Sequence, residues 1–172
     1  ANTRIGGPSV AERNIIAGAG SYCCEGLPTG AQIGVSGLAT GTHIENNYIG
    51  LAADGVTTIL QTGPTGISLF DAVDTTILNN VVSECYAVGQ NHFAGELFGT
   101  GISIAGQCVN TVVQGNNIGT DASGLSPIVN LVAIRVLNGQ NETLVPVNTL
   151  IGGDEPGQGN LIAFSVQQGI FL

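Results

Sequence analysis

The residues of this chain that could perform chemistry are acids and aromatics in four separate stretches. They are Tyr22, Glu25, Asp54, Glu84, Tyr86, His92, Glu96 and Asp121. Two carboxyl groups held about 6.5–9.5 Å apart would suit an inverting glycoside hydrolase. Several carboxylates together would suit calcium or another ligand, whereas solvated loop tips with Asp-Gly turns are the third interpretation. The choice depends on whether the fold gathers these side chains.

The cysteines and histidines give no metal-binding pattern. The chain has Cys23, Cys24, Cys85 and Cys108, and neither their spacing nor nearby histidines supply a tetrahedral ligand set. His92 has no Cys or His at ligand spacing, so we interpret it as a surface loop residue. We therefore expect disulfides or buried thiols, and no cofactor beyond the calcium considered above.

Composition argues against several classes of partner. The formal net charge is −9 and the only cations are Arg4, Arg13 and Arg135, so no basic surface is expected to track phosphates. We expect no nucleic acid and no anionic membrane as partner. No apolar stretch approaches the roughly 20 residues that span a bilayer. An acidic, glycine-rich chain with an even number of cysteines is typical of a secreted or cell-surface protein.

One sequence pattern recurs five times and predicts the fold. A Thr lies two residues before an Ile or Val at Thr3, Thr42, Thr75, Thr111 and Thr149, at intervals of roughly 33–39 residues. A second apolar run follows each copy, and a third closes each period, as at Gly34-Val35, Gly66-Ile67 and Gly101-Ile102. Runs this short and β-branched are typical of strands. The repeat predicts an all-β, right-handed parallel β-helix of about five coils with three short strands each.

The parity of each strand separates an inner from an outer face. In the first strand of each coil, Thr and Ile share one face and are expected to point inward. The outward positions that follow the third run are Ser36, Ser68, Ser103 and Arg135. This outer stripe offers no pair of acids, so we assign no catalytic residue to it.

An Asn opens the second run of every coil. The five residues are Asn14, Asn47, Asn80, Asn116 and Asn160. Each has the inward parity of its Ile, which predicts a stack of carboxamides at one corner. A stacked amide donates to one neighbour and accepts from the other, which Asp cannot do. Simple turn chemistry is the alternative interpretation.

The repeats resemble those of the right-handed parallel β-helix proteins of bacterial and archaeal surfaces, which have the form N-x-I-G-T-D-x-x-G. The matching segments are 116–124, 47–50 running on to Asp54-Gly55, and the paired segments 5–8 and 151–154. The resemblance covers nearly the whole chain. It implies the fold strongly and the function weakly, because this architecture carries lyases, hydrolases, epimerases, adhesins and inert stalks.

The longer connections between the second and third strands are expected to leave the solenoid at one corner. The acids and aromatics named at the outset would then gather into one patch. Cys85 and the pair Cys23 and Cys24 also lie in such connections, two coils or about 10 Å apart in rise. A disulfide of Cys85 with Cys23 or Cys24 is our hypothesis, with Cys24–Cys85 as the pair to test. Cys108 lies at another corner and is expected to be free, buried or paired with another chain.

Residues 1–172 are expected to form one solenoid domain without a cap at either end. Terminal coils without caps leave sheet edges open, so the first functional hypothesis is structural. The module would associate end to end with itself into a filament, or form part of a longer stalk or adhesin, with carbohydrate as a further candidate partner. The alternative is a fragment of a polysaccharide lyase, hydrolase or epimerase, or a carbohydrate-binding module. We expect no enzyme activity from these residues.

Overall fold

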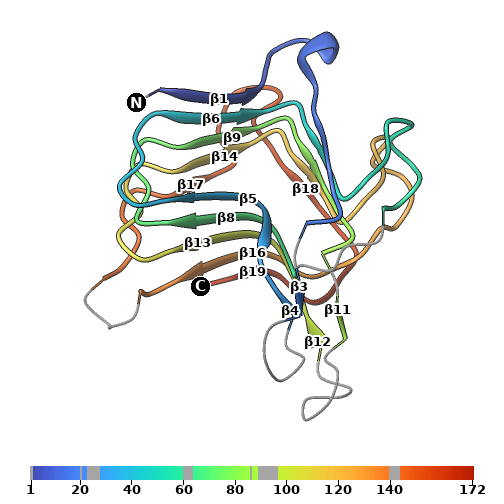
Figure 1. Cartoon of the computed structure of the whole chain (residues 1–172). Coiled ribbons are helices and arrows are strands. Elements are labelled where there is room, and N and C mark those ends of the chain that lie inside the picture. Colours follow the sequence, from blue (N-terminus) through green and yellow to red (C-terminus); the bar gives the residue numbers. More distant parts are fainter. Residues whose placement is uncertain are drawn as a thin grey trace.

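The computed structural model describes residues 2–19, 21–22, 28–59, 64–85, 87–88, 97–139 and 144–172. Over this part the chain winds into a β-solenoid with three parallel sheets of five strands each, stacked as successive rungs (Figure 1). From the first rung to the last the chain makes about four turns, slightly fewer than the predicted coil count. The prediction of an all-β solenoid with three strands per coil is confirmed.

Each sheet takes one strand from every coil. The first sheet contains β1 (Thr3–Gly6), β6 (Thr42–Glu45), β9 (Thr76–Leu78), β14 (Val112–Gln114) and β17 (Leu150–Ile151). The second contains β2 (Ile15–Ile16), β7 (Tyr48–Ile49), β10 (Val81–Val82), β15 (Asn117–Ile118) and β18 (Leu161–Ile162). The third contains β5 (Ala31–Ser36), β8 (Thr65–Phe70), β13 (Thr100–Ala105), β16 (Asn130–Leu137) and β19 (Ser165–Phe171).

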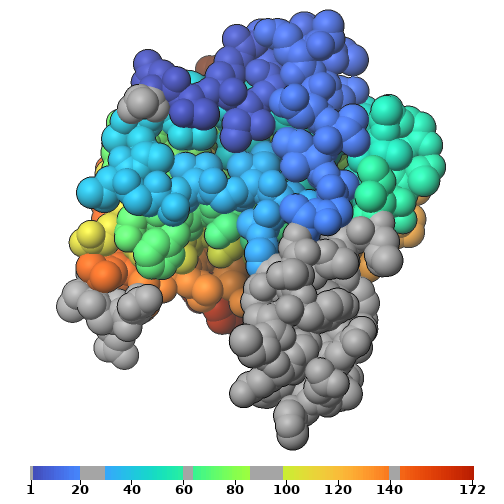
Figure 2. Space-filling model, in the orientation of Figure 1, coloured from blue at the N-terminus to red at the C-terminus, as the bar shows by residue number. Residues whose placement is uncertain are grey.

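Side chains alternate between core and surface along these strands. In β6, Thr42 and Ile44 are buried while His43 between them is exposed, as the period of two along a strand requires. The same alternation places branched aliphatic residues on top of one another from coil to coil. Fully buried members of this core are Ile44, Ile49, Ile67, Leu69, Ile77, Val82, Ile102, Ile104, Val113, Ile118 and Ile134. Figure 2 shows the coils from outside as successive bands of colour.

The register of the third sheet corrects one part of the sequence alignment. Ile33 pairs with Ile67 and Gly34 pairs with Ser68, whereas the repeat pattern had matched Gly34-Val35 to Gly66-Ile67. The predicted alignment of the first coil was therefore wrong by two residues. Gly34, not Ser36, lies in the outer row with Ser68. The error arose because β5 carries two inward aliphatic residues, Ile33 and Val35, and the pattern aligned the second.

Two short antiparallel hairpins lie between the second and third sheets. They pair β3 (Ser21–Tyr22) with β4 (Pro28–Thr29), and β11 (Ala87–Val88) with β12 (Leu97–Phe98). One 3₁₀ turn, η1 (Val10–Glu12), follows β1. Within the described residues no helix is long and apolar enough to cross a membrane.

Alternate coils carry matching loops that touch across the coil between them. The loop after β7 and the loop after β15 each close with an antiparallel bridge, Leu51 to Thr58 and Thr120 to Pro127. The Ala122 amide donates to the Gly55 carbonyl at 2.8 Å, which joins the two loops. Beneath them Leu51, Val81 and Ile128 form a second, smaller apolar cluster. Val81 points outward from β10, so these loops bury a residue that parity alone would expose.

Candidate functional site

The five predicted asparagines form a continuous hydrogen-bonded ladder. The Asn14 Nδ2 donates to Asn47 Oδ1 at 2.9 Å, and Asn47 Nδ2 donates to Asn80 Oδ1 at 3.0 Å. The series continues with Asn80 Nδ2 to Asn116 Oδ1 at 3.1 Å and Asn116 Nδ2 to Asn160 Oδ1 at 2.9 Å. Asn47, Asn80 and Asn116 are at most 1% exposed. The predicted interior ladder is thus present in the structure.

Each inner amide of the ladder makes a fixed set of contacts. Asn80 Nδ2 also donates to the Ile44 carbonyl of the preceding coil at 2.9 Å. The Asn80 Oδ1 accepts from both the backbone N–H and the Nδ2 of Asn47. Both side-chain N–H groups and both lone pairs of Asn80 are therefore used, which removes the cost of burying a polar group.

The ladder has a direction. In the four bonds between ladder residues, the Nδ2 of one Asn donates to the Oδ1 of the Asn in the following coil. The Nδ2 groups of Asn47, Asn80, Asn116 and Asn160 also donate to a backbone carbonyl of the preceding coil. At the first rung, the backbone N–H and the Nδ2 of Asn14 both donate to Asn47 Oδ1. At the last rung, Asn160 Oδ1 accepts from Asn116 Nδ2, and Asn160 Nδ2 donates to the Val113 carbonyl at 2.8 Å. The bonds between ladder residues therefore all run in the same direction along the solenoid.

Two predicted patch residues, Asp54 and Asp121, cap their own loops. Asp54 accepts from the backbone N–H groups of Val56 and Thr57 and from the Thr57 hydroxyl, at 2.6–3.0 Å. Hydrogen bonds, the Thr57 hydroxyl foremost, lower the pKa of Asp54. Asp121 accepts from the Ser123 hydroxyl at 2.7 Å and from two backbone N–H groups, with Ser123 the main cause of its lowered pKa. Both carboxylates therefore accept hydrogen bonds within their own loops, as Asp side chains commonly do in turns.

Glu84 is the third patch residue that the structure describes. It has φ 61 at the corner after β10, and partial burial raises the pKa of its carboxyl. The side chains of Tyr22, Glu25, Tyr86, His92 and Glu96 lie outside the described residues. Groups of three or more His, Cys, Asp or Glu side chains that could hold a metal ion are absent from the described part of the chain.

The predicted disulfide is not formed at Cys85. Cys85 is a free thiol, fully buried, and burial, with the Glu84 charge second, raises its pKa to about 12. The prediction failed at this residue because the Cys85 side chain packs inward into the core and donates to the Ser83 carbonyl. Cys23 and Cys24 lie outside the described residues. Cys108 is also a buried free thiol, in agreement with one of the alternatives for it.

Two polar features escaped the sequence analysis. An outer ladder runs from Asn148 Nδ2 to Asn110 Oδ1 at 3.1 Å and from Asn110 Nδ2 to Asp74 Oδ1 at 2.8 Å. All three residues have φ of 52–55 and immediately precede a Thr of the repeat, so their position in the repeat could have identified them. Asn130 is fully buried. Its Oδ1 accepts from the Cys85 N–H, and its Nδ2 donates to the Val82 carbonyl. Nothing in the repeat pattern marks Asn130, because it occurs once.

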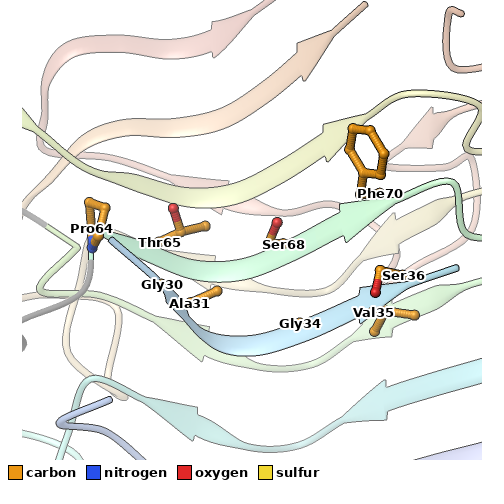
Figure 3. A pocket seen from close by; sticks show the side chains of 9 residues that line it. All are labelled: Gly30, Ala31, Gly34, Val35, Ser36, Pro64, Thr65, Ser68 and Phe70. Atoms are coloured by element: carbon orange, nitrogen blue, oxygen red, sulfur yellow. The ribbon is translucent and has the colours of Figure 1, made fainter. Parts of the chain in front are cut away.

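A shallow groove lies on the outer surface over β5 and β8. Its volume is about 480 Å³, and Figure 3 shows Gly34 between Pro64 at one end and Phe70 at the other. The nine lining residues are Gly30, Ala31, Gly34, Val35, Ser36, Pro64, Thr65, Ser68 and Phe70. None of these side chains is an acid or a base, so the lining itself supplies no general acid–base pair.

Comparison with known proteins adds no functional assignment. Neither a family model, nor a curated protein, nor a solved structure matches this chain. The class that the described residues define is a parallel β-solenoid with an internal asparagine ladder. The finer likeness to the surface-protein repeat remains a resemblance in sequence.

Proposed function

We propose that the chain is a structural β-solenoid module of a secreted or cell-surface protein, and that copies join end to end. The observation that carries this proposal is the polarity of the asparagine ladder. Each bond between ladder residues runs from an Asn Nδ2 to the Asn Oδ1 of the following coil. In a second copy stacked in the same direction, Asn14 Oδ1 could accept from Asn160 Nδ2 of the first copy and continue the ladder across the joint.

The apolar columns support the same arrangement. Ile5 and Ile170 are core residues of the first and last rungs, and Ile170 is 45% exposed while Ile134 beside it is fully buried. On the second sheet the outward residues Ile15 and Leu161 are 40% and 41% exposed. End-to-end stacking would pair Leu161 of one copy with Ile15 of the next. Parallel sheet edges with apolar flanks are contact surfaces of this kind.

The joint is heterologous, because it brings two different surfaces together. Such a contact propagates in one direction instead of closing into a symmetric dimer. A cross-section on the order of a few hundred Å², at roughly 25 cal/mol per Å², contributes several kcal/mol before association costs are subtracted. We therefore expect association that depends steeply on protein concentration.

Analytical ultracentrifugation over a concentration series, with electron microscopy of the concentrated sample, tests the proposal. We expect linear oligomers that lengthen with concentration, and their loss in Ile5→Lys, which places a charge in the joint. Val56→Lys is the matched control, since Val56 is 57% exposed on a side loop and should tolerate the same charge. A folded parent chain that stays monomeric at high concentration would overturn the proposal.

A further inference from the structure

We infer that a hollow on the side of the solenoid is a docking site for an arginine side chain of a partner protein. The hollow has a volume of about 340 Å³ and lies outside the corner between the first and second sheets. Its lining residues are Leu78, Asn79, Gln114, Pro156, Gly157 and Gln158. The hollow is not part of the proposed end-to-end joint, so this inference can be tested separately from that proposal.

The hollow forms where the connection from β17 to β18 packs against the central coils. β9 and β14 are inner strands of the first sheet (Figure 1), and Asn79 directly follows β9. The connection is held against the end of β14, because Gln114 Nε2 donates to the Gly152 carbonyl at 2.9 Å. The Gly115 N–H also donates to the Gln158 carbonyl at 3.3 Å. The hollow therefore lies beside the central coils and not at an end of the stack.

Two carbonyl oxygens of the hollow converge over Gly115, which has no side chain to separate them. A Cβ built on Gly115 would lie 2.3 Å from Asn79 Oδ1 and 3.0 Å from the Gly157 carbonyl oxygen. Neither oxygen accepts a hydrogen bond from a described residue. Two neighbouring acceptors suit a ligand with several N–H donors, and a guanidinium group presents its donors in one rigid plane.

Three acids flank the hollow and favour a cation in it. Glu45 pairs with Leu78 in the outer row of the first sheet, and Asp154 and Glu155 directly precede the lining residue Pro156. None of the three acids forms an ion pair with a described residue. Their charges would attract a cationic side chain and repel a carboxylate or phosphate.

The apolar part of the lining suits the stem of an arginine. Leu78 is half-buried and Pro156 is exposed, so both can contact a ligand. An arginine covers apolar surface with its methylene stem while its charged end forms hydrogen bonds. A lysine has fewer donors, and a neutral sugar gains nothing from the flanking acids, so the hollow fits arginine best.

NMR spectroscopy of the isotope-labelled chain tests the inference, with Nα-acetyl-arginine amide as the probe. We expect the probe to shift the side-chain amide signals of Asn79, Gln114 and Gln158, with a dissociation constant in the millimolar range expected for so small a ligand. Nα-acetyl-citrulline amide is the matched control, since citrulline keeps the length and the planar group of arginine without its charge. We expect it to bind at least about fivefold more weakly, because its hydrogen bonds are not charge-assisted. Added salt should weaken binding of the arginine probe alone.

Substitutions separate the hollow from a general attraction to an acidic protein. Asn79→Gly removes one of the convergent acceptors and should raise the dissociation constant of the arginine probe at least about threefold. Its thermal midpoint should stay close to that of the parent, because Asn79 is exposed with φ 55, which glycine adopts readily. Asn148→Gly is the matched control, since Asn148 is exposed with φ 54 at another corner, and it should bind the probe as the parent does. Glu155→Gln should weaken binding about twofold by removing one flanking charge.

Shifts confined to the hollow and weakened by Asn79→Gly would support the inference. Equal binding of the citrulline probe would identify a neutral ligand, and stronger binding of spermidine than of the arginine probe would identify a polyamine. Either result would overturn the assignment to arginine. Signals that do not shift at millimolar probe, or shifts spread over all exposed acids, would show that the hollow is not a docking site.

Discussion

Two columns of polar side chains, one of asparagines and one of threonines, run through the interior of the solenoid. They differ in how many of their polar atoms form hydrogen bonds. At the corner before the second sheet, Asn47, Asn80 and Asn116 use their amides in hydrogen bonds to neighbouring coils. In the first sheet the threonines of the repeat also point inward, yet the hydroxyl oxygens of Thr75 and Thr111 are buried without a hydrogen-bond partner within the described residues.

The difference follows from the geometry of the two side chains. A carboxamide has a donor and an acceptor separated by one carbon, so it spans the gap between rungs that lie about 4.8 Å apart. A Thr hydroxyl is too short to reach the next rung while its methyl packs in the core. Inward-pointing polar side chains therefore have two different roles in this solenoid. The asparagine column should stabilise the fold and give the stack of coils a direction, and the threonine column should do neither.

The largest effect should come from Asn80→Asp at neutral pH. Burial raises the pKa of the introduced carboxyl, so its charged form also destabilises the fold. The charge-dependent part of the loss should be absent below the unfolded pKa of about 3.9 and grow as pH rises through the higher folded pKa. Chemical denaturation of variant and parent at several pH values measures this. A difference that does not change with pH would contradict a buried position.

Asn80→Ala should cost somewhat less, about 1–3 kcal/mol of unfolding free energy. The change leaves the Asn47 amide without its acceptor and the Asn116 Oδ1 and Ile44 carbonyl without the Asn80 side-chain donor. Urea denaturation followed by circular dichroism is suitable. Equal stability of Asn80→Ala and parent would show that the ladder contributes nothing.

Asn14→Ala should cost about 0.5–1.5 kcal/mol, because Asn14 is exposed whereas Asn80 is buried. Its side chain makes one ladder bond, to Asn47 Oδ1, and that oxygen keeps the Asn14 backbone N–H as a second donor. The same denaturation assay gives the comparison. A cost equal to that of Asn80→Ala would mean that burial alone, and not the number of hydrogen bonds, sets the energy.

The smallest effect should come from Thr111→Val. The substitution keeps the shape and removes a buried hydroxyl without a partner, so the unfolding free energy should be unchanged or higher by up to about 1 kcal/mol. Thr76→Val is the control, since the Thr76 side chain points outward from β9 and its hydroxyl forms a hydrogen bond with the His43 ring at 2.7 Å. A loss above about 1 kcal/mol for Thr111→Val would contradict the contrast between the two columns.

Sequence predicted the ladder and the coil, because both depend on period and parity that recur in every repeat. The Asn14 to Asn160 series could be identified although its spacing from the preceding Ile varies. Features that occur once, or that depend on contacts between distant loops, were not predictable in this way. Asn130, the burial of Val81 beneath two loops, and the inward side chain of Cys85 are examples.

The two-residue error in the alignment around Gly34 shows a second limit of prediction from the sequence. Two inward aliphatic residues in β5 gave two alignments of equal quality by pattern, and only the hydrogen-bonded register of β5 with β8 separates them. That register places Gly34 in the outer row with Ser68 and Ser103. The composition of the outer row thus depended on a detail that parity could not resolve.

Mixing two variants, each blocked at one end, tests most directly the claim that the ladder gives the module a direction. Ile5→Lys closes the acceptor end and leaves the donor end intact, and Ile170→Lys does the reverse. Each variant alone should remain monomeric in sedimentation velocity, and an equimolar mixture should form dimers that grow no further. A mixture that stays monomeric while the parent chain associates, or a single variant that dimerises by itself, would contradict a directional joint.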